Sequence, residues 1–266
     1  MKKTKIFLGG GRTLGVRALE WLCTQDYLEI VAVCPVPQRL DPCAHDEFMN
    51  IVKKNKLKVC ELSDILSLDI DIGLSVNYHR IINERILCHC RKGFYNVHHS
   101  YNLRLRGRNI STHAILDTLK EDIFYHGTTL HKMVSELDAG PIVASRSVEI
   151  ASDDTAYTLF QKADKEAMSM ITEWIPRLLT QKVFLYDPPM EGIHSYKMAD
   201  LPSRKLNEEK MSIEELDVYI RAFDFPGREP AYFERDGKKI HLVFSERDEY
   251  RYVYNLKGHI YYTEVG

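Results

Sequence analysis

The sequence has no apolar run long enough to cross a membrane and no surplus of charge of either sign. Of its 266 residues, 44% are apolar, and 36 Lys and Arg stand against 38 Asp and Glu, a formal charge of −2. A membrane-spanning helix would need roughly 18 or more consecutive apolar residues, so none is expected. The balanced charge gives no basic footprint for nucleic acid and argues against a tRNA substrate. We therefore expect a soluble globular chain that acts on something other than nucleic acid.

Targeting and metal-binding signals are also missing. The lysines at the start precede an apolar run of only three residues, Ile6–Leu8, which is too short for a secretory signal and predicts a first strand. Cys88-His89-Cys90, even with Cys43 and His45 upstream, lacks the second well-spaced ligand pair of a zinc site. We expect reduced thiols in a cytoplasmic protein, and no metal.

Strands and helices alternate through the first two thirds of the chain. Lys5–Leu8 and Glu29–Cys34 read as strands around a glycine turn and the helix Val16–Cys23, and Ile70–Tyr78 reads as a further strand. This alternation predicts an α/β fold with a doubly wound, mostly parallel sheet. The helix after a later strand, Ile142–Ile150, is expected to be capped by Ser152 or Asp153.

The glycine turn Gly9–Gly15 imitates a dinucleotide-binding fingerprint but departs from it twice. Leu14 stands where the third glycine belongs, and Cys34-Pro35 occupies the place of the acidic residue that would bind a ribose. A tight strand-to-helix turn is the interpretation that we favour. A non-catalytic or nicotinamide-binding protein remains an alternative.

A break in the pattern at Asp187–Gly192 predicts a domain boundary. We expect an α/β domain at 1–186 and a small carboxyl-terminal domain at 187–266, built from one helix and antiparallel strands. Ser212 with Glu215 predicts a capping box at the start of that helix. Asp236-Gly237 predicts a two-residue hairpin turn.

Polar residues and glycines concentrate between Phe94 and Val143. In a strand, residues two apart share a face, so Asn96 and His98 would point the same way. An amide can donate a hydrogen bond to a developing oxyanion, and an imidazole, with a pKa near ~6.5, can accept a proton at neutral pH. Asp138 could hold the imidazole in the useful tautomer. Each residue alone is more often a turn former or a buried structural side chain.

Other histidines of this half of the chain are expected to have different roles from His98. We expect His99, His113 and His131 to be structural. His126 lies near the same edge of the predicted sheet and competes with His98 for the role of base.

The order and spacing of several motifs resemble those of the folate-dependent formyltransferases, from about residue 1 to 180. The matching pieces are Asn96-x-His98-x-Ser100, Arg106-Gly107, Thr129 and Asp138-x-Gly140, and the departure is Tyr101-Asn102-Leu103 where that family usually has Leu-Leu-Pro. The segment His126–Val143 is most similar to the sugar N-formyltransferases, relatives of the UDP-aminoarabinose formyltransferase and of methionyl-tRNA formyltransferase. The resemblance implies direct formyl transfer with Asn96, His98 and Asp138 as the catalytic residues.

The resemblance further implies 10-formyltetrahydrofolate as the formyl donor. The residues that it assigns to the cofactor are Arg80, Ile81, Ile82, Arg108, Val134, Ser135, Glu136, Leu137 and Asp138. Those that it assigns to the acceptor substrate are Asn77, Tyr78, Arg106 and Phe225.

The expected acceptor is a nucleotide-linked amino sugar, formylated in the cytoplasm for surface polysaccharide synthesis, by an enzyme that is expected to be a homodimer. A methionyl-tRNA formyltransferase would normally have a longer carboxyl-terminal barrel and a basic surface. Glycinamide ribonucleotide formyltransferase would lack residues 191–266 as a second domain. Dispersal of Asn96, His98 and Asp138 in the structure would favour a non-catalytic protein.

Overall fold

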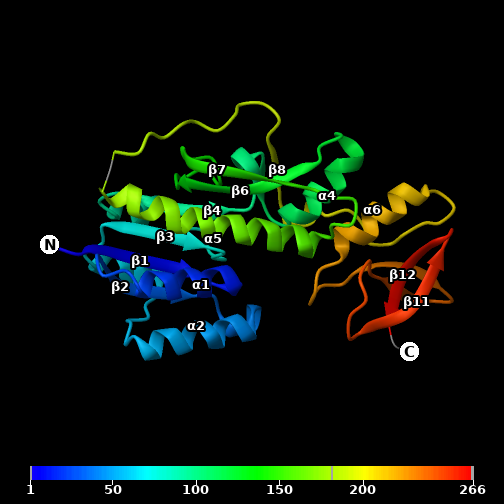
Figure 1. Ribbon diagram of the computed structural model, residues 1–266, viewed down its shortest axis with the longest axis horizontal. Helices are drawn as coiled ribbons and strands as arrows, with labels where there is room; N and C mark the ends of the chain where they lie inside the picture. Colours follow the sequence, from blue (N-terminus) through cyan, green and yellow to red (C-terminus); the bar gives the residue numbers. More distant parts are fainter. Residues whose placement is uncertain (1, 181, 265–266) are drawn as a thin grey trace. The chain divides into compact units, whose positions relative to one another are not determined.

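The computed structural model describes residues 2–180 and 182–264 (Figure 1). The chain divides into two compact units. The first comprises residues 1–104, 128–146 and 164–193, and the second residues 105–127, 147–163 and 194–266. Each unit is built from three separate segments of the chain. The domain boundary predicted after residue 186 stays a prediction.

Within the described residues, the central sheet has six strands in the order β2-β1-β3-β4-β6-β7. β1 pairs in parallel with both β2 and β3, β3 pairs in parallel with β4, and β4 pairs antiparallel with β6. The mostly parallel α/β sheet predicted from the sequence is confirmed. Its strands are β1 (Thr4–Gly10), β2 (Leu28–Pro35), β3 (Ile72–Val76), β4 (Phe94–His98), β6 (Tyr125–Lys132) and β7 (Ile142–Glu149).

Helices cover both faces of the sheet in the first unit because its strands carry apolar residues on both sides. On one face, Tyr95 and Val97 of β4 share a core cluster with α1, α2 and the later part of α5, and Trp21 and Trp174 pack at its margin. On the other face, Phe94 and Phe7 share a cluster with α3. The helical elements are α1 (Arg12–Cys23), η1 (Gln38–Leu40), α2 (Pro42–Lys54), η2 (Leu62–Ser67), α3 (Glu84–His89), η3 (Tyr101–Leu103) and α5 (Ala156–Thr180).

The second unit has its own apolar clusters, one around α4 and one around α6 with the terminal strands. Two antiparallel hairpins, β9–β10 and β11–β12, follow α6. The predicted capping box is present, since the Ser212 side chain accepts from the Glu215 amide and the Glu215 side chain accepts from the Ser212 amide. Asp236 and Gly237 have φ values of 52° and 74°, as a hairpin turn of the predicted kind requires. The elements are β5 (Leu105–Gly107), α4 (Ile110–Lys120), β8 (His194–Tyr196), η4 (Met198–Asp200), α6 (Ile213–Phe223), β9 (Ala231–Arg235), β10 (Lys238–Leu242), β11 (Tyr250–Leu256) and β12 (His259–Glu264).

The predicted cap of α5 is wrong. The residue before the helix is Thr155, whose hydroxyl accepts a hydrogen bond from the Thr158 amide at 3.2 Å. Asp154 is used one turn earlier, where its carboxylate accepts from the Ala151 amide at 2.8 Å. Ser152 and Asp153 lie two to three residues before the position from which a side chain can reach the first helical amides.

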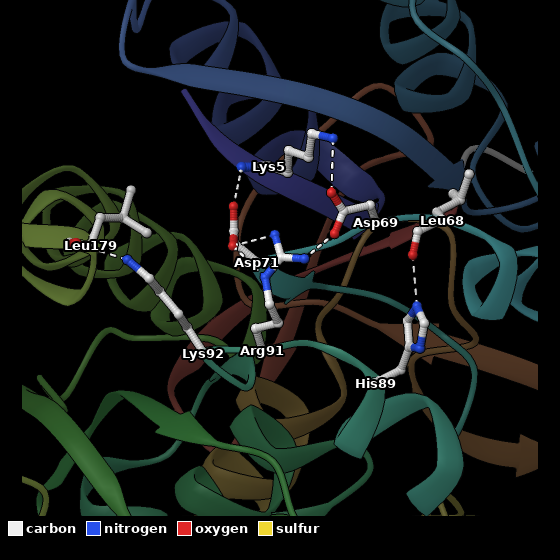
Figure 2. A network of polar contacts seen from close by, with 8 residues as sticks. All are labelled: Lys5, Leu68, Asp69, Asp71, His89, Arg91, Lys92 and Leu179. Carbon is white, nitrogen blue, oxygen red and sulfur yellow. Dashed lines mark hydrogen bonds and ion pairs between the residues drawn. The ribbon is translucent and has the colours of Figure 1, made fainter. Parts of the chain in front are cut away.

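A group of charged side chains ties together the amino ends of β1 and β3 and the turn before β4 (Figure 2). Lys5 donates from its backbone amide to Asp71 at 2.8 Å and from Nζ to Asp69 at 2.9 Å. The Arg91 guanidinium bridges both carboxylates, with Nε 2.8 Å from Asp71 Oδ1. Lys92 donates to the carbonyl of Leu179 at 3.0 Å. We call Lys5, Asp69, Asp71, Arg91 and Lys92 the amino-edge network.

None of the helices formed by residues 2–180 and 182–264 combines the length and apolar character needed to span a membrane.

Candidate active site

The carboxyl ends of neighbouring parallel strands meet at one edge of the sheet in the first unit. Val76 pairs with Gly10 of β1 and with Val97 of β4, so the residues that follow these strands emerge side by side. In open α/β sheets ligands bind beyond this edge. Asn77 follows β3 there, and His98 ends β4.

Asn96 and His98 lie on one face of β4, as their spacing predicted. Their partners on antiparallel β6 are His131 opposite Asn96 and Thr129 opposite His98. Directly opposed residues in a ladder present their side chains on the same face. Four polar side chains therefore gather on one face at the edge of the sheet.

Asp138 reaches this group from the turn between β6 and β7. Its φ of 49° lies in the left-handed region, which Asp tolerates better than most residues. Gly140 is needed two residues later because a Cβ there would lie 1.8 Å from the carbonyl oxygen of Lys132. Asp138 is 8% exposed. Its Oδ2 lies 3.7 Å from His98 Nδ1, and its Oδ1 lies 3.4 Å from Asn96 Nδ2.

His131 is the member of this group that sequence reasoning missed. Its Nε2 lies 3.3 Å from Asn96 Nδ2 and 3.8 Å from Asp138 Oδ1, and its side chain is 2% exposed. Its Nδ1 lies 3.2 Å from the carbonyl of Lys132, so Nδ1 carries the proton and Nε2 accepts from the Asn96 amide. The sequence does place His131 and Thr129 two apart on one strand, but the register that sets them opposite Asn96 and His98 belongs to the folded sheet.

Hydroxyl groups fix the turn that follows His98. Thr129 donates to the carbonyl of Ser100 at 2.5 Å and lies 2.8 Å from the Ser145 hydroxyl, which in turn accepts from the Asn102 amide at 2.8 Å. Asn102 and Leu103 both have positive φ, 50° and 57°. The departure from the family pattern at Tyr101-Asn102-Leu103 thus corresponds to a tight left-handed turn anchored to β6 and β7.

The predicted residues after β3 have diverse surroundings. The Asn77 side chain turns toward Asp164 of α5, with Nδ2 to Oδ1 at 3.4 Å. The Tyr78 hydroxyl lies 3.1 Å from Cys34 Sγ, and burial raises the pKa of this phenol above its usual range.

Arg80 pairs with Glu61 at 2.6 Å at the surface. Ile81 is 82% exposed, whereas Ile82 is 4% exposed and belongs to the core cluster around Phe94.

The predicted cofactor loop before Asp138 is exposed over residues 134–137. Val134 and Leu137 are 39% and 54% exposed. Met133, just before the loop, packs against the core cluster that contains Ile82. The two segments predicted to hold a pterin, residues 80–82 and 134–138, therefore both adjoin this core cluster.

Three predicted residues lie in the second unit. Arg106 is buried in β5, and Arg108 is exposed with its backbone amide donating to Tyr196 at 3.0 Å. Phe225 is half-buried, with its ring edge-on to Tyr157 and Phe160 at 5.3 and 5.5 Å.

His126, the competing base, is 2% exposed and lies three residues before Thr129 in β6. Alternation along the strand therefore directs it to the face opposite Thr129 and His131.

The six cysteines are free thiols. Burial raises the pKa of Cys60 to about 11 and that of Cys90 to about 12, so both stay protonated and weakly nucleophilic at neutral pH. Within residues 2–180 and 182–264, no three His, Cys, Asp or Glu side chains form a group that could hold a metal ion.

The polar side chains gathered around β4 have the groups needed for acyl transfer. An amide, two imidazoles and a carboxylate lie together, with 3.3–3.8 Å between their nearest polar atoms. Such a group can donate to an oxyanion and accept a proton from an attacking nucleophile. Residues 44–175, which include all of these side chains, match the formyl transferase family. The chain contains a formyl transferase domain.

The relatives of this formyl transferase domain include enzymes with different acceptors. GDP-perosamine N-formyltransferase of Brucella melitensis biotype 1 is 30% identical over 178 residues, 66% of this chain and 65% of that protein. Methionyl-tRNA formyltransferase of Listeria innocua is 28% identical over 193 residues, 68% of this chain and 60% of that protein. This chain therefore spans less than two thirds of the length of either relative.

Similarity to a solved structure extends beyond the formyl transferase domain. The crystal structure of WlaRD, a sugar 3N-formyl transferase in the presence of dTDP and 5-N-formyl-THF, has a TM-score of 0.77 and 20% identity. The similarity covers 99% of this chain and 98% of WlaRD. At this identity the comparison establishes the fold.

Proposed function

We propose that the protein transfers a formyl group from 10-formyltetrahydrofolate to the amine of a nucleotide-linked amino sugar. The observation that carries the proposal is the convergence of Asn96, His98 and Asp138 at the carboxyl edge of the sheet within a formyl transferase domain. The sugar acceptor is supported by the 30% identical GDP-perosamine N-formyltransferase and by a fold shared with WlaRD along nearly the whole chain. The formal charge of −2 favours such an acceptor over a tRNA.

His98 would act as the base that takes the proton from the amine. Its Nδ1 faces Asp138, so a proton on Nδ1 would be stabilised by the carboxylate and Nε2 would keep its lone pair. Once Nε2 has taken the proton, the negative charge of Asp138 stabilises the imidazolium. The separation of 3.7 Å leaves this contact to shorten as positive charge develops on the ring.

Asn96 would donate to the oxygen of the tetrahedral intermediate. Its amide nitrogen donates to His131 and Asp138 through bonds of 3.3 and 3.4 Å, both at the long end of the hydrogen-bond range. Exchanging one of these weak bonds for a bond to a full negative charge is favourable. His131 would keep the amide oriented during the exchange, because its Nε2 can only accept.

The residues predicted to hold the folate suit a flat, partly apolar ligand. Ile81 and Leu137 expose apolar surface, and residues 134–137 form an exposed loop outside the strands. When bound, 10-formyltetrahydrofolate supplies the activated formyl carbonyl. Exposed apolar side chains would cover the ring faces, and backbone amides and carbonyls would bind the ring edge.

Phe225 is proposed to contact the acceptor. Its ring packs edge-on to two aromatic rings, Arg228 lies 4.5 Å over its centre, and part of it stays exposed. Phe225→Ala should raise KM for the amino sugar with little change in melting temperature. A purely structural ring would instead lower the melting temperature and leave KM unchanged.

A homodimer is proposed through the hairpin β11–β12. Val253 and Ile260 are 64% and 59% exposed, and their partners across the ladder are Tyr262 and Asn255, which places both on the same outward face. Apolar surface that continues across neighbouring strands is typical of contact surfaces, and these two side chains would form its centre. Light scattering should give a dimer mass for the wild type and a monomer mass for Val253→Arg with Ile260→Arg. A monomeric wild type would overturn this part.

The decisive experiment incubates the protein with 10-formyltetrahydrofolate and a panel of UDP-, dTDP- and GDP-linked amino sugars. Mass spectrometry should show the gain of one formyl group on at least one sugar. A parallel incubation with initiator methionyl-tRNA tests the competing acceptor. Formylation of the tRNA alone would replace the sugar proposal, and no transfer to any acceptor would overturn the function.

A further inference from the structure

A second imidazole–carboxylate contact lies directly beside the candidate site. His99 follows His98, and its Nε2 lies 3.0 Å from Asp164 Oδ1 of α5. The two side chains are 8% and 12% exposed. The contact is a close polar approach whose geometry departs from that of an ideal hydrogen bond.

The same carboxylate oxygen also holds the turn after β3. Asn77 has a φ of 49°, a left-handed conformation, and its side-chain amide donates to Asp164 Oδ1 at 3.4 Å. β3 and β4 are parallel neighbours, with Ser75 opposite Asn96. One oxygen of Asp164 therefore links the turns that leave two adjacent strands of the site.

Asp164 approaches β4 from the face opposite to the candidate catalytic group. Tyr95 and Val97 share their core cluster with Ala167 and Met170 of α5, whereas Asn96 and His98 alternate to the other face. Asp138 contacts His98 on that other face. The end of β4 is thus held by one carboxylate on each side, from two different elements.

We propose that Asp164 is a positioning residue for formyl transfer, which rests on the proposed role of His98 as base. By contacting His99 and Asn77 together, Asp164 restricts the backbone on the carboxyl side of His98, as Thr129 does at Ser100. A base displaced by about 1 Å loses on the order of 10²-fold in rate. The charge of Asp164 and its two contacts keep the His98 imidazole in register with Asn96.

The test compares Asp164→Asn and Asp164→Ala with the wild type. Asp164→Asn keeps an oxygen that can accept from Asn77 and removes the charge that faces His99, whereas Asp164→Ala removes both contacts. We expect kcat to fall about tenfold and about 10²-fold respectively, with KM for both substrates within about a factor of three. The matched control is Glu166→Gln on the same helix, which loses a surface ion pair with Arg146 of 3.2 Å and should leave kcat unchanged.

A double variant of Asp164 and His99 distinguishes a positioning role of Asp164 from a general disturbance of the structure. In a His99→Asn background, Asp164→Asn should lower kcat by no more than about twofold further, because the contact that it breaks is already absent. Full additivity of the two losses, a loss confined to KM, or wild-type kcat in Asp164→Asn would each overturn the proposal.

A spectroscopic measurement tests the proposal without using turnover. In proton–nitrogen correlation spectra of the histidine side chains, Asp164→Asn should shift the resonances of both His99 and His98, and Glu166→Gln should shift neither. If only His99 moves, Asp164 does not position His98. If the wild type formylates no acceptor while both resonances shift, the proposed function fails and the linkage between the two histidines stands.

Discussion

The two ends of the parallel strands in the first unit are both rich in polar side chains, but the side chains are arranged differently. In the amino-edge network, Lys5, Arg91 and the two aspartates meet at short distances, and the side chains of Asp69 and Arg91 are 50% and 48% exposed (Figure 2). At the carboxyl edge, Asn96, His98, His131 and Asp138 are more deeply buried and lie 3.3–3.8 Å apart.

This difference distinguishes a network that stabilises the fold from a group of side chains that can bind and act on a ligand. Charges in short direct pairs are already matched, and exposed pairs of this kind contribute only about 0–1 kcal/mol each. Buried polar groups interact more strongly with a developing charge than exposed groups do, because water and salt screen them less. The carboxyl edge is therefore the place where these side chains can act on a ligand.

The substitution His98→Asn should have the largest effect on kcat, and it tests the difference between the two edges of the sheet most directly. Loss of the proposed base should lower kcat by about 10²–10⁴-fold while folate affinity and melting temperature change little. Steady-state kinetics, folate titration and thermal unfolding measure the three quantities. His89→Asn is the matched control, because His89 donates to the Leu68 carbonyl at 2.7 Å at the other end of the sheet. Equal losses in both variants would remove the distinction between the two edges.

Asn96→Ala should have the next largest effect. Removing the proposed oxyanion donor should lower kcat by about 10²–10³-fold with KM nearly unchanged, because the bond forms in the transition state. Single-turnover kinetics measure the chemical step directly. A variant that loses affinity for either substrate and keeps its kcat would show that Asn96 binds the ground state instead.

Asp69→Asn should have the smallest effect on activity and a distinctive effect on stability. Hydrogen bonds from Lys5 and Arg91 lower the pKa of Asp69 to about 2. A carboxyl whose pKa is lowered by folding stabilises the native state above its unfolded pKa of about 4, and this contribution is lost as the pH falls through about 2. The stability of wild type and variant should therefore differ at neutral pH and converge between pH 4 and 2, with kcat unaffected.

Denaturant titrations at several pH values make this measurement. A constant difference between wild type and Asp69→Asn across the acid range would show that the carboxylate charge is not what stabilises the amino edge.

Much of this arrangement could be predicted from local sequence. The alternation of strands and helices predicts the sheet, and the two-residue spacing of Asn96 and His98 correctly predicts that both lie on one face of β4. Asp138 came from resemblance to a family, since no local rule connects it to a strand about 40 residues earlier. Its left-handed φ and its dependence on Gly140 become visible only in the folded turn.

Other parts of the site depend on long-range register. His131 joins Asn96 because β6 pairs with β4 in one particular register. Asp164 meets Asn77 across 87 residues of sequence, because α5 packs on the sheet where β3 ends. A single helix position or strand register decides such contacts, and sequence periodicity does not specify either.

The positions of the tryptophans make it possible to follow the unfolding of the first unit separately from that of the second. The sequence has two tryptophans, and Trp21 and Trp174 both pack at the margin of that cluster. Arg177 lies 4.7 Å over the Trp174 ring, close enough to influence its emission. Intrinsic tryptophan fluorescence therefore reports on the first unit alone, while the terminal hairpins of the second unit contribute only tyrosine signal. Recording both emissions during unfolding would distinguish a chain that melts in one step from one whose two units melt separately.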